Sequence, residues 1–203
     1  MKKYRDSYFL QAKMENYPAR SIYKLKEMDA RFHLLKPGLR VLDLGAAPGS
    51  WSLGAAEKVG KTGLVLACDL QEANITFPPQ VCFVREDVFN RSEKFQTLLL
   101  KTAPFDLVMS DMAPKTTGSR ITDQVRSLNL ALEAFELAIA HLKGGGNFVV
   151  KIFMGPDTDE LMQPMRQAFE TVRAFKPKSS RDESKETFYV ALNFCAGAGE
   201  TGR

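Results

Sequence analysis

The sequence predicts an α/β fold with one seven-stranded, mostly parallel sheet whose last strand runs antiparallel. Apolar runs with strand character alternate for the most part with helical patterns, as in a doubly wound sheet. The last two strands are joined by a short polar connection that has no room for a packed crossover helix, so the final strand should run antiparallel to its neighbour. The seven predicted strands cover residues 40–44, 64–69, 81–84, 105–110, 146–152, 171–175 and 187–194, and that last connection covers residues 176–186.

Helical patterns fill the intervals between strands. In residues 19–32, Ile22, Leu25 and Met28 lie on one helical face, and Lys24 lies off that stripe. A longer pattern runs from about residue 123 to 142. Both patterns predict helices that pack against the sheet.

Length and composition exclude several classes of protein. With 203 residues and 44% apolar content, the chain can bury one full core. No apolar run approaches the ~20 residues that a membrane span needs, and the N-terminus lacks the apolar core of a secretory signal. Cys68, Cys82 and Cys195 form no C-x-x-C pair, and the two histidines lie far apart, which gives a metal site little support. We expect a cytoplasmic protein without a bound metal.

Charge is distributed unevenly between the N-terminal segment and the rest of the chain. The net charge is +4, yet residues 1–40 hold ten Lys or Arg against four Asp or Glu, so the other 163 residues total −2. We therefore divide the chain into a basic arm (1–17), a main domain (18–194) and a disordered tail (195–203). Such an arm indicates contact with a polyanion; a solvated charged terminus is the alternative.

The segment from Val41 to Trp51 carries the first functional signal. An apolar strand leads into a turn that contains Gly45 and Gly49, and a helix follows, which together make a nucleotide-sized crevice. The turn lacks the G-x-G-x-x-G spacing of a dinucleotide site, and Asp43 precedes its first glycine by two residues. An acid there suits a ligand with an amine or a sulfonium, such as S-adenosylmethionine.

Two further acids follow the next strands. Asp69 ends the strand 64–69, where folds of this kind bind ribose hydroxyls, and Asp87 closely follows the strand 81–84, where it could receive an adenine amino group. A single acid at a strand end is often a helix cap or a turn former. Three acids at successive strand ends favour a cofactor site.

Polar residues also occur where a buried strand would not tolerate them. Asp111 follows the strand 105–110 at the same edge as the glycine turn, so it should point toward the crevice. Lys151 lies within an otherwise apolar run, where an unpaired ammonium would cost several kcal/mol. Glu186, at the start of the last strand, should lie beside the strand that carries Lys151. A catalytic group and a buried salt-bridge network are both consistent with this pattern.

Taken with these residues, the chain resembles the FtsJ-type ribosomal RNA ribose 2′-O-methyltransferases, and the match covers Tyr8 to Tyr189. This family has the Rossmann-like S-adenosylmethionine-dependent methyltransferase fold, with six parallel strands and one antiparallel strand. One departure is Ser50, where many members have a second glycine. The matching segments are Tyr8–Ala12, Arg20–Leu25, Asp43–Trp51, Ser110–Pro114, Val149–Lys151 and Ser184–Glu186.

The resemblance implies specific site residues. The family's Lys-Asp-Lys-Glu tetrad corresponds to Lys24, Asp111, Lys151 and Glu186, with Glu186 favoured over its neighbour Glu183 by the Ser-Lys-Glu context. Cofactor contacts carry over to Gly49, Trp51, Asp69 and Asp87, with Asp111 near the methyl group. Together with Asp43 and Gly45 from the turn, these residues make up the predicted S-adenosylmethionine site.

The resemblance also implies a reaction. It predicts methylation of a uridine ribose in large-subunit (23S-type) ribosomal RNA, on the assembled subunit, by a monomeric enzyme with no membrane partner. Lys151 would act as general base or steer the hydroxyl; the charge of Lys24 would favour loss of its proton, whereas Asp111 and Glu186 would oppose it. Methylation of transfer RNA stays open. The missing G-x-G-x-x-G argues against a nicotinamide-dependent oxidoreductase, and the complete tetrad argues against an inactive RNA-binding protein of the same fold.

Overall fold

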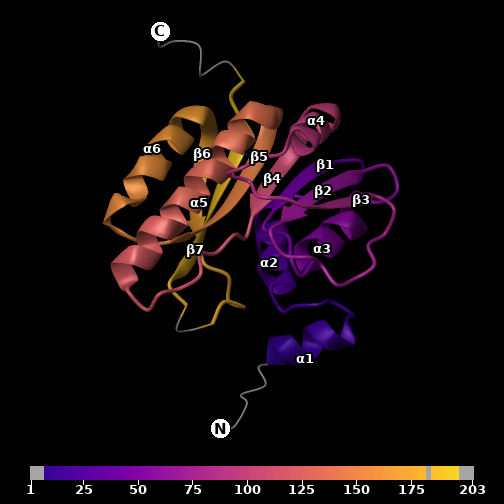
Figure 1. Cartoon of the computed structure of the whole chain (residues 1–203), viewed down its shortest axis with the longest axis horizontal. Coiled ribbons are helices and arrows are strands. Elements are labelled where there is room, and N and C mark those ends of the chain that lie inside the picture. The colour runs from indigo at the N-terminus through magenta and orange to yellow at the C-terminus, as the bar shows by residue number, and fades with distance from the viewer. Residues whose placement is uncertain (1–6, 182–183, 197–203) are drawn as a thin grey trace.

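Seven strands form one sheet in the order β3-β2-β1-β4-β5-β7-β6 in the computed structural model, which describes residues 7–181 and 184–196 (Figure 1). Strand β7 is antiparallel to both of its neighbours, β5 and β6, whereas the pairs among β1 to β5 are parallel. The predicted fold class is confirmed. The strands are β1 (Arg40–Leu44), β2 (Leu64–Asp69), β3 (Val81–Arg85), β4 (Phe105–Ser110), β5 (Leu142–Phe153), β6 (Phe169–Phe175) and β7 (Glu186–Phe194).

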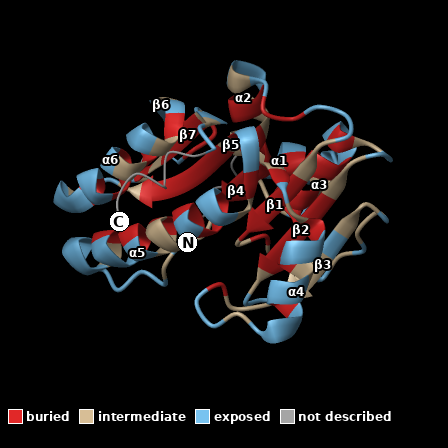
Figure 2. Ribbon diagram, turned by 90° about the horizontal axis from the view of Figure 1, so that it is seen from above, coloured by how far each residue is buried: buried red, intermediate tan, exposed pale blue. Residues whose placement is uncertain are grey.

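Helices cover both faces of this sheet, and the buried residues follow the sheet and the inner sides of the helices (Figure 2). Helices α4, α5 and α6 pack on one face, and α2 and α3 pack on the other, each with its own apolar cluster. Among the described residues, no helix is long and apolar enough to cross a membrane. The helices are α1 (Ser7–Met14), α2 (Ile22–Phe32), α3 (Ser50–Val59), α4 (Glu93–Thr102), α5 (Arg120–His141), the 3₁₀ turn η1 (Pro156–Thr158) and α6 (Asp159–Ala168).

Alternation along each strand decides which helices a side chain meets. Val41 belongs to the cluster on the side of α2 and α3, and its neighbour Leu42 belongs to the cluster on the opposite side. In β5, Val149 lies on the α2 side and Val150 on the α5 side. A residue two positions after Val41 or Val149 therefore faces α2 and α3.

Several predicted boundaries differ from the structure. Helix α5 begins three residues earlier than expected, and β5 begins at Leu142 rather than at residue 146 because Leu142 already pairs with Phe105 ahead of an irregular glycine stretch. Helix α1 was not predicted, since Ala12 is its one buried residue and leaves no apolar stripe to detect. The first six residues of the predicted arm and residues 197–203 of the predicted tail lie outside the described residues.

Candidate active site

Two glycines shape the turn between β1 and α3. Gly45 has a φ of +76°, and a Cβ there would lie 2.6 Å from Cγ of Met112, which follows β4. Gly49 has a φ of +110°, and a Cβ there would lie 2.4 Å from Cδ1 of Ile75. Larger residues would strain the backbone and push these neighbours away. The turn therefore requires glycine at both positions, as its small-residue character indicated.

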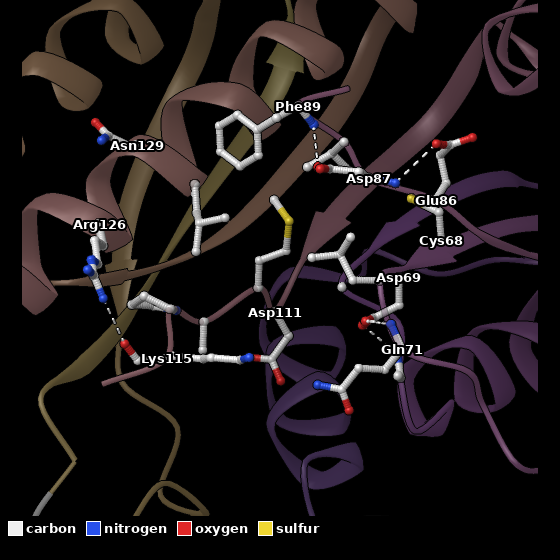
Figure 3. Close-up of a pocket in the computed structure, with 18 residues that line it drawn as sticks. Cys68, Asp69, Gln71, Glu86, Asp87, Phe89, Asp111, Lys115, Arg126 and Asn129 are labelled. Atoms are coloured by element: carbon white, nitrogen blue, oxygen red, sulfur yellow. Dashed lines mark hydrogen bonds between the residues drawn. The ribbon is translucent and has the colours of Figure 1, made fainter. Parts of the chain in front are cut away.

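A cavity of about 640 Å³ opens at the carboxyl ends of the parallel strands beside this turn. Asp69, Glu86 and Asp87 lie on one side of it, and Arg126 lies on the other (Figure 3). Four carboxylates line the cavity against two cations, so we call it the acidic cavity. Its charged residues are Asp69, Glu86, Asp87, Asp111, Lys115 and Arg126.

The strand-end acids in the acidic cavity are held by backbone groups. Asp69 Oδ2 accepts a hydrogen bond from the Ala47 N–H at 2.9 Å, and its Oδ1 accepts one from the Gln71 N–H at 2.8 Å. Asp87 Oδ1 accepts the Phe89 N–H at 2.9 Å. Because an ionised carboxylate has about four acceptor sites, both side chains keep acceptor capacity for a ligand.

Asp43 is placed differently from the other acids. Its side chain points from β1 toward α3, where Oδ2 accepts a hydrogen bond from the Ser52 hydroxyl at 2.6 Å; its Oδ1 is buried and has no hydrogen-bond partner in the described part of the chain. Burial raises the pKa of Asp43 to about 7. The nearby charges of Asp111 and Asp69 also raise this pKa, whereas the hydrogen bond from Ser52 lowers it. The described lining of the acidic cavity does not include Asp43.

Trp51 and Gly49 also lie away from that lining. The Trp51 indole is buried, its Nε1–H donates to the Ser21 carbonyl at 2.8 Å, and its ring lies 5.7 Å from that of Phe188. These contacts tie α3 to α2 and β7. Of the residues predicted to bind the cofactor, the structure brings four together in the acidic cavity: Gly45, Asp69, Asp87 and Asp111.

The four residues of the predicted tetrad lie together in the structure, as two ion pairs. Lys151 Nζ donates to Asp111 Oδ1 at 2.8 Å and to the Asp111 backbone carbonyl at 2.5 Å. Lys24 Nζ lies 2.5 Å from Glu186 Oε1.

Strand register explains why these distant residues meet. Lys151 is two residues after Val149, so it faces α2, which carries Lys24. Because β7 is antiparallel to β5, the first residue of β7, Glu186, pairs with Phe153 at the edge where β5 ends. Asp111 directly follows β4, beside the same edge.

The two pairs interact with each other through Glu186. Burial alone would raise the pKa of Glu186, but the charge and hydrogen bond of Lys24, a hydrogen bond from the Ser180 hydroxyl at 2.9 Å and the charge of Lys151 lower it. Glu186 is therefore ionised at neutral pH. Lys151 is only 6% exposed, and Asp111 compensates its charge.

A second cavity, of about 420 Å³, is lined by the other ion pair of the tetrad, Lys24 and Glu186. Its described lining holds the three cations Arg20, Lys24 and Arg181 against the single carboxylate Glu186, so we call it the basic cavity. Arg20 donates to the Ser179 carbonyl, and burial together with the charge of Arg181 lowers the pKa of Arg20. The neighbouring Glu183 lies outside the described residues.

Sequence reasoning missed the part that Arg20, Ser180 and Arg181 play in this site. Arg20 stands in the matched segment Arg20–Leu25 but was given no role. Ser180 and Arg181 lie in a polar connection that carried no pattern, and only the fold brings that connection beside α2. The tetrad separates the two cavities: Asp111 lines the acidic one, whereas Lys24 and Glu186 line the basic one.

Known proteins resemble this chain over almost its whole length. The protein named ribosomal RNA large subunit methyltransferase E from Nitratidesulfovibrio vulgaris strain DP4 is 68% identical over 194 residues, which cover 96% of this chain and 95% of that protein. The protein of the same name from Lawsonia intracellularis is 62% identical, with 96% and 97% covered.

Solved structures are similar as well. A crystal structure described as a ribosomal RNA methyltransferase from Plasmodium falciparum has a TM-score of 0.75 at 28% identity and covers 88% of this chain and 98% of that one. An rRNA-methylase structure from Clostridium thermocellum, with a TM-score of 0.59 at 18% identity and coverage of 85% and 97%, shares the fold. Residues 17–194 match the model of the FtsJ-like methyltransferase family. The chain therefore belongs to the FtsJ-like methyltransferase family and is an S-adenosylmethionine-dependent methyltransferase.

Proposed function

We propose that this protein methylates the 2′-hydroxyl of a uridine ribose in large-subunit ribosomal RNA, on the assembled large subunit. The observation that carries the proposal is the position of the tetrad between an acidic and a basic cavity. A sulfonium cofactor suits a cavity rich in carboxylates, and a polyanionic RNA suits a cavity rich in cations. The two substrates would then approach Lys151 and Asp111 from opposite sides.

The residues of the acidic cavity fit S-adenosylmethionine. Asp69 and Asp87 retain acceptor capacity for ribose hydroxyls and an adenine amine, and the partly exposed side chains of Leu70 and Phe89 offer apolar surface for the adenine ring. Gly45 keeps the floor of the cavity open beside Met112. When bound, the cofactor supplies a methyl group already activated by a positively charged sulfur. The protein must therefore chiefly orient the nucleophile and receive its proton.

Lys151 is the residue that we assign to the ribose hydroxyl. Two hydrogen bonds to Asp111 fix the position of its ammonium, so little side-chain freedom remains to be lost in the reaction. In its neutral form Lys151 takes the hydroxyl proton; in its charged form it donates to the hydroxyl oxygen and aims a lone pair. Lys24 and Glu186 line the cavity that we assign to RNA, and their opposite charges compensate each other.

The choice of RNA rests on relatives. The Nitratidesulfovibrio and Lawsonia proteins carry the name of a large-subunit ribosomal RNA methyltransferase, and they match this chain over almost its full length. We extend that likeness to four further points: a uridine target, the assembled subunit as substrate, a monomeric enzyme and a cytoplasmic location. The basic arm and the 115–121 loop would add to the grip on RNA.

The test supplies labelled S-adenosylmethionine with large ribosomal subunits, free ribosomal RNA and transfer RNA, each from a strain that lacks the enzyme. We expect label in the large subunits, at a single uridine whose 3′ phosphodiester bond resists alkaline hydrolysis because its 2′-oxygen is methylated. Label in transfer RNA alone would overturn the RNA assignment and leave the chemistry intact. A folded protein that binds S-adenosylmethionine and labels none of the three would instead support the inactive RNA-binding alternative.

A further inference from the structure

Another hollow, of about 580 Å³, lies between α1, α2 and the end of β6. Three aromatic rings and three cations line it, and we call it the aromatic groove. It has no part in the tetrad or in the cofactor site. The aromatic groove is defined by Tyr8, Tyr23, Lys26, Arg31, Phe175 and Lys178.

The free charge in the aromatic groove is positive. Its carboxylate, Glu27, accepts the backbone N–H groups of Lys178 at 2.6 Å and Ser179 at 2.8 Å, and Lys26 is paired with Glu15 at 2.7 Å. Arg31 and Lys178 are exposed, and neither makes an ion pair within the part of the chain that the structure describes. These two cations are available to an anionic ligand.

The aromatic rings are held in fixed positions. The Tyr8 and Tyr23 ring centroids lie 5.3 Å apart, and Phe175 meets Phe32 edge-on at 5.5 Å and 82°. Tyr8 and Phe175 are nevertheless only partly buried. Rings that are already ordered cost a ligand little conformational entropy on binding.

The aromatic groove adjoins the active site through two shared elements. Tyr23 immediately precedes Lys24 on α2, and Lys178 immediately precedes Ser179, which lines the basic cavity. The Glu27 carboxylate ties the second element to α2, and Arg20 binds the Ser179 carbonyl beside it. A chain that leaves the basic cavity past Ser179 thus meets the aromatic groove.

We propose that the aromatic groove binds an unpaired nucleotide of the substrate RNA that flanks the methylated one. The base stacks against the aromatic side chains, and the phosphates pair with Arg31 and Lys178. Aromatic platforms combined with cations are the means by which proteins hold single-stranded nucleic acid. The inference rests on the proposed RNA methylation and adds that the RNA beside the target is unpaired.

The first experiment removes the two available cations. The double variant Arg31→Ala/Lys178→Ala should raise the KM for large subunits on the order of tenfold and flatten the log–log salt dependence of RNA binding by roughly 1.4. The kcat and the affinity for S-adenosylmethionine should stay as in wild type. The double variant Lys61→Ala/Lys94→Ala is the matched control, because it removes two exposed lysines that lie outside the three cavities.

The second experiment tests stacking. Binding of a ten-nucleotide oligouridine and of a duplex RNA of equal length is followed by fluorescence anisotropy in Tyr8→Phe and Tyr8→Leu. Tyr8→Leu should weaken oligouridine binding about fivefold or more, and Tyr8→Phe, which keeps the ring, should not. Duplex binding should change equally little in both variants, and thermal unfolding checks that both are folded.

The outcomes separate this inference from the proposed function. If wild type labels ribosomal RNA and the groove variants match the lysine control, the groove inference fails and the function stands. If wild type labels no ribosomal RNA, the proposed function fails, and the oligouridine measurements still decide whether the groove binds RNA.

Two results would identify another occupant of the aromatic groove. Defects with assembled subunits but not with free RNA or oligouridine would point to a ribosomal protein as occupant. Loss of self-association in sedimentation with unchanged RNA binding would point to a second copy of the chain. Either result would overturn the inference.

Discussion

The acidic and basic cavities are lined by different members of the tetrad and present opposite charge. Carboxylates outnumber cations four to two around the acidic cavity, whereas three described cations face one carboxylate around the basic cavity. The difference supports our proposal that a cationic ligand binds on the Asp111 side of the tetrad and an anionic one on the side of Lys24 and Glu186. In the reaction that we propose, both approaches would end at the Lys151–Asp111 pair, of which Asp111 lines the acidic cavity.

One buried carboxyl lies near each cavity, and the pKa values of these two carboxyls shift in opposite directions. Among the residues that the structure describes, no cation bonds to Asp43, and burial raises its pKa to about 7. Glu186 is also largely buried, yet Lys24 at 2.5 Å lowers its pKa. Burial alone therefore does not decide the protonation of a carboxyl in this protein; the presence of a paired cation does.

The largest expected effect comes from Lys151, the residue that we assign to the ribose hydroxyl. Lys151→Ala should lower kcat by about 10³-fold or more, because the hydroxyl loses its acceptor or steering group. S-adenosylmethionine affinity, measured by calorimetry, should be little changed. Lys151→Arg should fail too, since arginine keeps its proton and has a different shape. If Lys151→Ala retains a tenth of wild-type kcat, the catalytic role assigned to Lys151 is wrong.

The second effect is on stability and concerns Asp43. Its raised pKa means that, between about pH 4 and pH 7, the native protein keeps a proton that the unfolded chain has released, so stability falls as pH rises through this window. A shift from 3.8 to about 7 corresponds to at most about 4 kcal/mol. Asp43→Asn should remove this pH dependence. In denaturant unfolding, the free energy of unfolding of the variant should therefore increase relative to that of wild type between pH 4 and pH 7.

A matched control and a second readout sharpen the Asp43 test. Asp157→Asn removes an exposed carboxyl and should leave the pH dependence of unfolding as in wild type. S-adenosylmethionine affinity of Asp43→Asn should change little, because the side chain lies away from the cavity lining. A tenfold loss of affinity in a stable variant would support the cofactor role that the sequence predicted for Asp43.

The positions of Asp43 and Asp69 show a limit of prediction from sequence: it did not tell which of these acids reaches the cavity. Both acids lie near strand ends in the sequence, but Asp43 is inside β1 and Asp69 is the last residue of β2. Alternation directs both side chains to the side of α2 and α3, but Asp43 pairs with Ala67, so Asp69 lies two residues farther toward the carboxyl edge. Asp43 therefore meets Ser52 on α3, and Asp69 reaches the cavity. The bounds 40–44 and 64–69 agree with the prediction; how far each acid lies from the cavity depends on the pairing register of the two strands, which the sequence pattern does not give.

Other features were predictable because they follow from local rules. Alternating periods and the short 176–186 connection predicted the sheet and the antiparallel last strand. The apolar run around Lys151 predicted a buried lysine with acidic partners, and Asp111 and Glu186 lie at its end of the sheet. The basic cavity and the aromatic groove were not predicted. Their residues come from distant segments that only the fold brings together, as the bond from Arg20 to the Ser179 carbonyl illustrates.

A third effect should be confined to the acidic cavity. Asp69→Ala removes an acceptor for the cofactor and should weaken S-adenosylmethionine binding by about 1.5–3 kcal/mol, measured by calorimetry. The KM for RNA should not change, because Asp69 does not line the basic cavity. Asp69→Asn keeps one carbonyl oxygen and should lose less. Wild-type cofactor affinity in folded Asp69→Ala would remove this strand end from the site.

The smallest effect should be confined to the basic cavity and is the converse of the Asp69 result. Arg181 is exposed at the rim and close enough to Arg20 for their charges to repel, so an incoming phosphate would relieve that repulsion. Arg181→Ala should raise the KM for RNA about threefold and flatten the salt dependence by roughly 0.7, the value for one phosphate contact on a single strand. S-adenosylmethionine affinity should be unchanged, and Lys61→Ala serves as the equal-charge control. If Arg181→Ala and Lys61→Ala share the same salt dependence, Arg181 makes no phosphate contact, and the RNA side of the comparison would rest on Arg20 and Lys24.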